Sequence, residues 1–229
     1  MNAAQSMQQS PVVEVAGYRF ASPTLLRQAL THRSHSADHN ERLEFLGDAV
    51  LNCVIAADLY RLYPSTAEGD LSRARASLVN GHTLCALANE LGIGPRLLLG
   101  EGEIRSGGAQ RPSMLANAVE AIIGAVYLDG GFGAAQSFTL QIFSDSLKNI
   151  DLRVAGKDAK TLLQELLQAR HLPVPRYAVI ATAGEAHEQS FKVECSVPEM
   201  NIKTQGDGAS RRAAEQMAAR HAYDLIAGA

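Results

Sequence analysis

Several common features are missing from this 229-residue sequence. It has no tryptophan, and aromatic residues make up only 5% of the chain. Its three cysteines, Cys53, Cys85 and Cys195, are far apart, which excludes a disulfide framework and a CxxC metal site. No apolar run approaches the roughly 18 residues that a membrane helix needs, and Ala121 to Leu128 is about the longest. The N-terminus lacks the basic start and apolar stretch of a secretory signal. We therefore expect a cytoplasmic protein with no membrane partner.

An excess of basic residues is also missing. The chain has 21 Lys and Arg against 24 Asp and Glu, a formal net charge of −3 and a pI near 6.2. Residues 1–156 carry 12 basic and 15 acidic side chains, and residues 157–229 carry nine of each. Bulk charge therefore gives no indication of nucleic-acid binding, and any contact with phosphates must come from local clusters. The 46% of hydrophobic residues is enough to form a substantial core.

Residues 1–150 are expected to form an all-α bundle. Apolar residues recur there with helical spacing, and no alternating strand pattern occurs. Helix breakers separate the periodic segments at Pro64, at Gly92 to Pro95 and at Gly100 to Pro112, and we expect the last of these to be a mobile loop. The apolar positions that define the helices are Leu43, Leu46, Val50 and Val54, then Leu84, Leu87, Ala88 and Leu91, then Leu115, Val119, Ile122, Ile123 and Val126.

The pattern changes after residue 150. Residues 151–157 predict a short linker, and residues 158–229 predict a small α+β domain of αβββα order. Its first helix has an apolar face of leucines. Three strands are expected at residues 176–182, 191–197 and 200–204, where apolar residues alternate. A turn at residues 206–210 leads into the last helix, whose inner face is predicted to hold Ala214, Met217, Ala218, His221, Leu225 and Ile226.

Acidic residues cluster on two of the predicted helices. Glu41, Glu44 and Asp48 are spaced i, i+3 and i+7, so they share one face beside apolar neighbours. Asn117 and Glu120 share a face of a later helix that otherwise consists of Ala, Val, Ile and Leu. Clustered like charges repel and a buried carboxylate is costly, unless a cation compensates for both. Oxygen ligands from two helices suit Mg²⁺ or Mn²⁺, and such sites typically perform phosphoryl chemistry.

These residues resemble the signature of the ribonuclease III family. The central match is Glu41-RLEFLGDAVL, and its flanks are Ala29-LTHRS, Glu68-GDLSRARASLVN and Leu115-ANAVEAIIGAVYLD. The αβββα segment, which ends with Gly206-DGASRRAAE, resembles a double-stranded-RNA-binding domain. The resemblance covers about residues 15–227. It implies a homodimeric endoribonuclease that cuts double-stranded RNA and leaves 5′-phosphate and 3′-hydroxyl ends. The substrates it implies are precursors of ribosomal RNA, together with structured messenger RNA and some transfer RNA precursors.

The resemblance also assigns roles to particular residues. The family's metal ligands fall on Glu44, Asp48, Asn117 and Glu120, and its supporting acidic positions fall on Glu41 and Glu68. Asp48 and Glu120 are the expected catalytic residues, with Mg²⁺ as the cofactor and Mn²⁺ as a possible substitute. The family usually has Asp where this chain has Asn117. An amide oxygen still binds Mg²⁺ but it is neutral, so the site loses one negative charge. The alternative is therefore a regulator that binds double-stranded RNA with weak or no cleavage, although the other acidic positions are intact.

By the same resemblance, three regions of the C-terminal domain contact RNA, recognising the shape of the duplex. The first helix contributes Thr161, Gln164 and Glu165. The loop after the first strand contributes Gly184, Glu185, Ala186 and His187. The start of the last helix contributes Ser210, Arg211 and Arg212. The wider domain family often has a third basic residue where this chain has Glu215, which predicts a modest affinity for RNA.

Other functional classes fit the sequence less well. A di-iron carboxylate protein needs a Glu-x-x-His pair on facing helices, and neither acidic helix has one. The spacing of His32, His35 and His39 does not indicate a zinc site, because no cysteine lies nearby. The glycine-rich segment 100–112 lacks the GK[ST] ending of a phosphate-binding loop, so it does not predict nucleotide binding.

Overall fold

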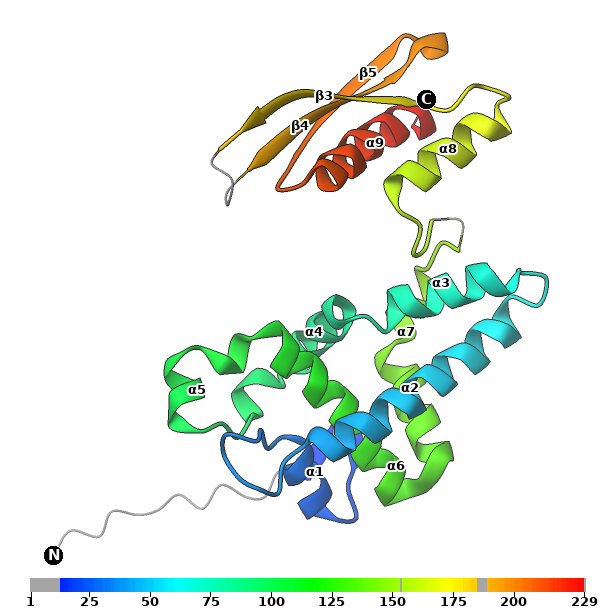
Figure 1. Cartoon of the computed structure of the whole chain (residues 1–229). Coiled ribbons are helices and arrows are strands. Elements are labelled where there is room, and N and C mark those ends of the chain that lie inside the picture. Colours follow the sequence, from blue (N-terminus) through cyan, green and yellow to red (C-terminus); the bar gives the residue numbers. More distant parts are fainter. Residues whose placement is uncertain (1–12, 153, 185–188, 229) are drawn as a thin grey trace, which may run out of the picture. The chain divides into compact units, whose positions relative to one another are not determined.

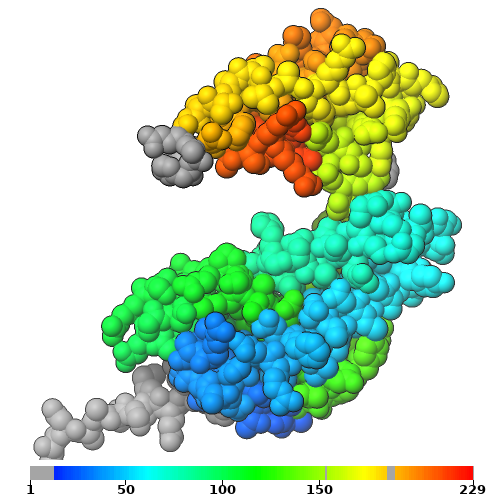
Figure 2. Space-filling view, viewed as in Figure 1, coloured from blue at the N-terminus to red at the C-terminus, as the bar shows by residue number. Residues whose placement is uncertain are grey.

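The computed structural model describes residues 13–152, 154–184 and 189–228. They form two compact units, Met1–Ala155 and Gly156–Ala229. The first unit is helical, and the second has the order αβββα (Figure 1). Each unit consists of one continuous segment of the chain, as the separate colour ranges in Figure 2 show. The structure therefore confirms both predicted fold classes.

The first unit begins with a short hairpin that the sequence did not predict, in which β1 (Glu14–Val15) pairs antiparallel with β2 (Tyr18–Arg19). The segment expected to be a mobile loop before the acidic helix contains a short helix and a 3₁₀ turn. The helical elements of the unit are α1 (Pro23–Ala29), α2 (Glu41–Leu62), α3 (Glu68–Leu78), α4 (Gly81–Glu90), η1 (Gly94–Arg96), α5 (Glu101–Arg105), η2 (Gly108–Gln110), α6 (Pro112–Ile142) and α7 (Ser144–Lys148).

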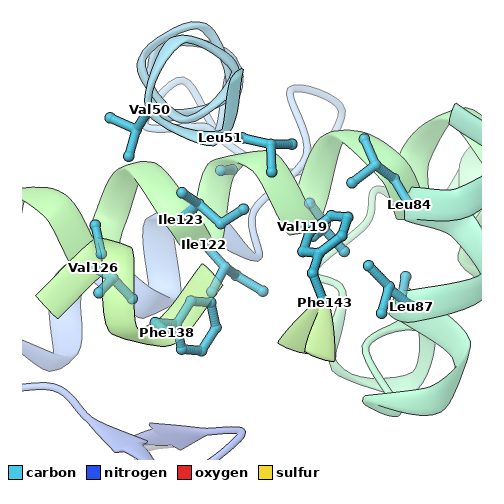
Figure 3. Close-up of a cluster of buried hydrophobic side chains, with 14 of the residues drawn as sticks. Val50, Leu51, Leu84, Leu87, Val119, Ile122, Ile123, Val126, Phe138 and Phe143 are labelled. Carbon is cyan, nitrogen blue, oxygen red and sulfur yellow. The ribbon is translucent and has the colours of Figure 1, made fainter. Parts of the chain in front are cut away.

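Helix α6 is the centre of the first core. Side chains of α2 and α4 pack on it, with Val50 and Leu51 on one side of α6 and Leu84 and Leu87 on another (Figure 3). By length and composition α6 could also cross a membrane, but half of its most apolar window is buried inside this unit. The helix turns sharply at Gly131, where φ is 77°, a value that glycine adopts without steric cost.

Two glycines allow α2 and α6 to cross at very short range. A Cβ atom added to Gly47 would lie 1.8 Å from the backbone oxygen of Glu120. A Cβ atom added to Gly124 would lie 2.3 Å from the backbone oxygen of Leu43. Any larger side chain at either position would force the helices apart. This crossing (α2 and α6 in Figure 1) places the acidic face of one helix beside the acidic face of the other.

The second unit is a three-stranded antiparallel sheet with two helices, in the strand order β3-β4-β5. Val193, Cys195 and Val197 alternate along β4 and are buried against the helices. The third strand runs further than predicted and ends at Gly208, inside the segment 206–210 that was expected to be a turn. The elements are α8 (Ala159–Ala169), β3 (Arg176–Ala183), β4 (Ser190–Val197), η3 (Pro198–Met200), β5 (Ile202–Gly208) and α9 (Arg211–Ala227).

The predicted inner face of the last helix was partly wrong. Met217, His221 and Leu225 are exposed, whereas Ala219 and Ala222 are buried with Ala214, Ala218 and Ile226. The physical reason is the close packing of α9 on β5. A Cβ atom added to Gly206 would lie 2.3 Å from the backbone nitrogen of Ala218. Only small side chains fit between backbones this close, so alanines line the contact and the larger apolar residues lie outside it.

Candidate functional site

The crossing of α2 and α6 brings the predicted acidic residues of both helices together. The backbone carbonyl of Glu120 lies against Gly47, which is between Glu44 and Asp48 on α2. The carboxylate of Glu120 is close enough to feel the charges of both Glu44 and Asp48. Asn117, one turn earlier on α6, forms a side-chain hydrogen bond with Glu44. Four of the predicted site residues therefore meet at one place, although the pair on α2 and the pair on α6 lie more than 60 residues apart in the sequence.

Two carboxylates of this cluster, those of Glu44 and Glu120, hold protons more tightly than usual. Burial, and then the negative charges of Asp48 and Glu44, raise the pKa of Glu120 to about 7. Burial and the charge of Glu41 also raise the pKa of Glu44, although the hydrogen bond from Asn117 acts in the opposite direction. Both shifts have the same origin, which is negative charge gathered in a partly buried place with too little positive charge around it. A cation would relieve this repulsion.

The chemistry of the donor set fits a hard divalent cation. Glu44, Asp48 and Glu120 offer carboxylate oxygens, and Asn117 offers an amide oxygen, so every donor is one that Mg²⁺ or Mn²⁺ prefers. The side-chain N–H of Asn117 donates to Glu44, which leaves its oxygen as an acceptor. Asn117 thus holds Glu44 by attraction at a position where an Asp would repel it.

The carboxylates of the acidic cluster do not form a complete set of metal ligands in this structure. Among the described residues, no three His, Cys, Asp or Glu side chains are grouped closely enough to hold a metal ion. Asp48 instead accepts a hydrogen bond at 2.9 Å from the side chain of Asn52, one turn further along α2.

A polar pocket of about 280 Å³ opens beside the acidic cluster. Three of the predicted residues, Glu41, Glu44 and Asn117, line it. Two basic residues that sequence reasoning missed also line it, together with one further acid. Arg33 contacts Glu41 at 3.3 Å, and the Nη1 atom of Arg111 contacts Glu103 at 3.1 Å. For Glu103 and Arg111, the signal in the sequence was the charged glycine-rich segment 100–112 just before the second acidic helix. That segment does not reveal which helix its charged side chains approach.

Glu68 does not join this cluster within one chain. It begins α3, after α2 has continued for 14 residues past Asp48, a length of about 21 Å for a helix that rises about 1.5 Å per residue. Its carboxylate accepts a hydrogen bond at 2.7 Å from the hydroxyl of Ser72 on its own helix. The predicted site residues on α2 (Glu41, Glu44 and Asp48) all lie in its first two turns, whereas Glu68 follows the far end of that helix.

The second unit gathers the predicted RNA-binding residues of its two helices around a surface pocket of about 630 Å³. Thr161 and Gln164 of α8 and Arg211 and Arg212 of α9 line it. The N-termini of α8 and α9 therefore lie close together on one face of this unit. Helix N-termini favour anionic ligands such as phosphate, although the N–H groups of Lys160, Thr161 and Ala213 already have acceptors within the unit.

Other predicted RNA-binding residues have local partners or lie outside the described residues. The hydroxyl of Ser210 caps α9 by accepting a hydrogen bond at 3.2 Å from the N–H of Ala213. Glu165 forms an ion pair at 2.7 Å with Lys157. Gly184 follows β3 with φ of 94°, a conformation that favours glycine. The remaining predicted residues of that loop, Glu185, Ala186 and His187, lie outside the described part of the chain.

Two carboxylates that line this pocket, those of Asp158 and Glu215, hold protons less tightly than usual. The N–H of Thr161 donates to Asp158, the cap of α8, and this bond is the main reason that the pKa of Asp158 is lowered. A hydrogen bond from Lys160, and then one from Arg211, lower the pKa of Glu215. Each carboxylate here has cations or N–H donors of its own, in contrast to the acidic cluster of the first unit.

Comparison with known proteins assigns both units. Residues 22–146 match a family model described as ribonuclease-III-like, and residues 159–226 match the double-stranded RNA binding motif. The chain is 57% identical to Ribonuclease 3 of Ralstonia pickettii over 91% of this chain and 81% of that protein. It is 53% identical to Ribonuclease 3 of Nitrosomonas europaea over 91% of this chain and 85% of that protein.

Among solved structures, the nuclease domain of ribonuclease III from Campylobacter jejuni is similar at a TM-score of 0.56 and 43% identity. The match covers 57% of this chain and 92% of that domain. Fold and site thus define a helical nuclease unit joined to a double-stranded-RNA-binding unit. The chain belongs to the ribonuclease III family. Nothing in these comparisons supports the alternative of a regulator without cleavage.

Proposed function

We propose that this protein is a metal-dependent endoribonuclease that cuts double-stranded RNA. The observation that carries the proposal is the set of oxygen donors that two crossing helices bring together beside a pocket with two arginines. The second unit supports it, because two helix N-termini and two arginines form a face suited to phosphates. Hydrolysis adds water across one phosphodiester. The P–O3′ bond breaks, the 3′ oxygen takes up a proton, and the products carry a 5′-phosphate and a 3′-hydroxyl.

In this proposal Glu44, Asp48, Asn117 and Glu120 hold Mg²⁺, for which Mn²⁺ can substitute. A bound divalent ion makes water a better nucleophile and stabilises the charge that develops on the phosphate and on the leaving oxygen. Asn117 keeps Glu44 in place through its N–H donor. Glu41 is a supporting residue, which orients Arg33 through their ion pair.

Arg33 and Arg111 extend the proposal to the bound RNA. Both guanidinium groups line the same pocket as Glu44 and Asn117, and charge-assisted hydrogen bonds to phosphate oxygens are the strong interactions that arginine forms. Glu103 holds Arg111 through its Nη1 atom, while the Nη2 atom donates to the hydroxyl of Ser106 at 3.2 Å. We assign Arg33 and Arg111 to the phosphates that flank the scissile bond.

We also propose that the protein works as a homodimer. The side chain of Phe45 on α2 is 81% exposed and borders a groove of about 580 Å³, whose apolar lining includes Leu46 and Leu128. An aromatic residue exposed beside an apolar groove is typical of a surface that another chain covers. One Campylobacter jejuni structure is described by a region involved in dimer formation of its nuclease domain. Replacement of Phe45 by Asp should give a monomer in light scattering.

The expected substrates of such an enzyme are long paired regions in precursors of ribosomal RNA, in structured messenger RNA and in some transfer RNA precursors. The second unit should recognise the A-form shape of these duplexes and their 2′-hydroxyl groups. Because these RNAs are cytoplasmic, we propose a cytoplasmic location for the protein.

A cleavage assay on a long, perfectly paired RNA tests the proposal. We expect short duplex products with Mg²⁺ or Mn²⁺, none with EDTA, and none when Glu120 is replaced by Gln. Single-stranded RNA and duplex DNA of the same sequence should stay intact. Tight binding of the duplex without cleavage in either metal would contradict the proposed enzyme and leave an RNA-binding protein.

A further inference from the structure

Glu215 lies at the centre of the cation cluster on the second unit. Its side chain is only 13% exposed, and each carboxylate oxygen has a different cation as partner. Oε2 accepts from Nζ of Lys160 at 2.6 Å, and Oε1 accepts from Nε of Arg211 at 2.9 Å. Glu215 therefore joins the start of α8 to the start of α9.

Lys160 is held on more than one side. Its backbone N–H donates to the side chain of Gln216 at 3.2 Å. Its ammonium group lies 4.4 Å from the ring centre of Tyr177, within the range of a cation–π interaction. These contacts make Lys160 an anchor between α8, α9 and β3. Glu215 is thus attached to a fixed point at one of its two oxygens.

Arg211 is the exposed end of this arrangement. Its side chain is 65% exposed, and it lies at the first position of α9. The bond to Glu215 uses the Nε–H, so the donors on the two terminal nitrogens are left for another partner. A guanidinium fixed in this way presents its outer donors in one orientation, beside the N–H groups of a helix end. Phosphate is the ligand that this geometry suits.

We propose that Glu215 is a positioning residue for duplex RNA, which orients Arg211 towards a backbone phosphate while Lys160 holds Glu215 in place. The inference rests on the proposed function of the second unit. It reverses the expectation from the sequence that an acidic residue at this position weakens the affinity for RNA. Two cations already neutralise the carboxylate, so little of its charge is left to repel phosphate. The lowered pKa of Glu215 agrees with this neutralisation.

The test is the affinity of the full chain for a fluorescent RNA duplex of about 20 base pairs, which exceeds the roughly 16 that such a domain spans. EDTA prevents cleavage, and fluorescence anisotropy is measured over a series of salt concentrations. Loss of one well-oriented phosphate contact should weaken binding about fivefold to tenfold in Glu215→Gln. The slope of log Kd against log salt should fall by about one. Glu215→Lys should bind more weakly still, because a third cation repels Lys160 and Arg211.

Glu199→Gln is the matched control. It makes the same change of charge at an exposed residue in the β4–β5 connection, separated from the start of α9 by the whole of β5. Its affinity should equal or slightly exceed that of the wild type. A second control compares the single variant Arg211→Ala with a double variant that carries both Arg211→Ala and Glu215→Gln. If Glu215 acts through Arg211, the second change should have almost no effect once Arg211 is gone.

Each outcome decides the inference. Equal or tighter binding by Glu215→Gln would overturn it, since the carboxylate would then only oppose the phosphates. Additive losses in the double variant would also overturn it. A lower melting temperature with unchanged affinity, measured where circular dichroism shows a folded protein, would reduce Glu215 to a structural residue. If the wild type itself fails to bind duplex RNA, the proposed function of the second unit fails, and the inference, which rests on that function, fails with it.

Discussion

Carboxylates stand at the working face of both units, but their pKa values are shifted in opposite directions. In the nuclease unit, burial and neighbouring negative charge raise the pKa values of Glu44 and Glu120. In the RNA-binding unit, donors from the chain itself lower the pKa values of Asp158 and Glu215. The first pair lacks positive charge that a metal ion would supply. The second pair already has it, and so is suited to orienting the cations around it.

Asp129 shows that the hydrogen-bond donors around a carboxylate decide the direction of its pKa shift, whichever unit it lies in. It lies on α6, nine residues after Glu120. Burial alone would raise its pKa. Hydrogen bonds from the N–H groups of Ala21 and Ser22 and from the hydroxyl of Tyr18 outweigh burial and leave the pKa below its ordinary value. Within one helix, a carboxylate with three donors binds the proton weakly and a carboxylate without them binds it tightly.

The largest combined effect, on stability as well as on cleavage, is expected from Gly47→Ala, which breaks the crossing that the acidic cluster needs. The new methyl group would clash with the backbone of Glu120, and overpacking of this kind costs about 3 kcal/mol. A shift of about 1 Å in the ligand positions should lower the cleavage rate about a hundredfold. Duplex binding in EDTA should persist, because the second unit forms its own core. Urea unfolding, cleavage and anisotropy measure the three quantities.

Gly133→Ala is the control for that experiment. It lies on the exposed part of α6, and a Cβ atom there meets nothing within 4 Å. Because alanine favours helix, this variant should be as stable as the wild type or more stable by up to about 1 kcal/mol. Normal cleavage by Gly47→Ala would show that the site does not depend on the close crossing.

The next largest effect is expected from Glu120→Gln, which removes the most strongly shifted carboxylate. Loss of a metal ligand should lower the cleavage rate at least about a hundredfold at any Mg²⁺ concentration. In EDTA at pH 8 the variant should unfold at a higher temperature than the wild type, since a buried, uncompensated charge has been removed. Mg²⁺ should then stabilise the wild type more than the variant. Glu90→Gln, an exposed residue of α4, serves as the control and should change neither property.

A smaller effect is expected from Asn117→Asp, which adds a charge to the set of ligands. The Mg²⁺ concentration for half-maximal cleavage should fall about tenfold, because more negative charge binds the cation more tightly. The rate at saturating Mg²⁺ should stay within about threefold of the wild type. In EDTA the variant should be less stable, since Glu44 would exchange an N–H donor for a second carboxylate. If cleavage appears only in the variant, Asn117 has silenced the natural enzyme.

The smallest effect is expected from Asp129→Asn, which tests the carboxylate of the first unit that accepts three hydrogen bonds. The loss of charge-assisted hydrogen bonds should cost about 1–3 kcal/mol at pH 7. Because folding lowers the pKa of Asp129, its contribution is complete above the ordinary value of 3.8 and is lost as the pH falls through the folded value. The difference in unfolding free energy between wild type and variant should therefore shrink below about pH 4.

Asp145→Asn is the corresponding control. Asp145 is exposed, and its only ion pair, within the part of the chain that the structure describes, is with Lys148 at 3.5 Å. Its replacement should change stability by less than about 0.5 kcal/mol at every pH. A constant difference for Asp129→Asn across the acidic range would mean that its hydrogen bonds do not depend on its charge.

The αβββα order of the second unit and the long helices of the first were readable from the sequence because they depend on near neighbours, whereas the β1–β2 hairpin and the short helix α5 were not. Helical spacing of apolar residues in the first unit and alternation in the strands of the second are local patterns. The acidic face of α2 was readable for the same reason, since Glu41, Glu44 and Asp48 lie within two turns of one helix. These features need no knowledge of what packs against them.

The pocket and the cation cluster were decided only by the tertiary structure. Arg111 and Glu103 line the same pocket as Glu44, although they come from segments about 60 residues further along the chain. Glu215 changes from a repulsive charge to an orienting one because α8 brings Lys160 to it. Met217 is exposed because α9 lies too close to β5 for a large side chain. The sequence determined which chemical groups each helix carries, and the approach of distant backbones decided which of those groups meet.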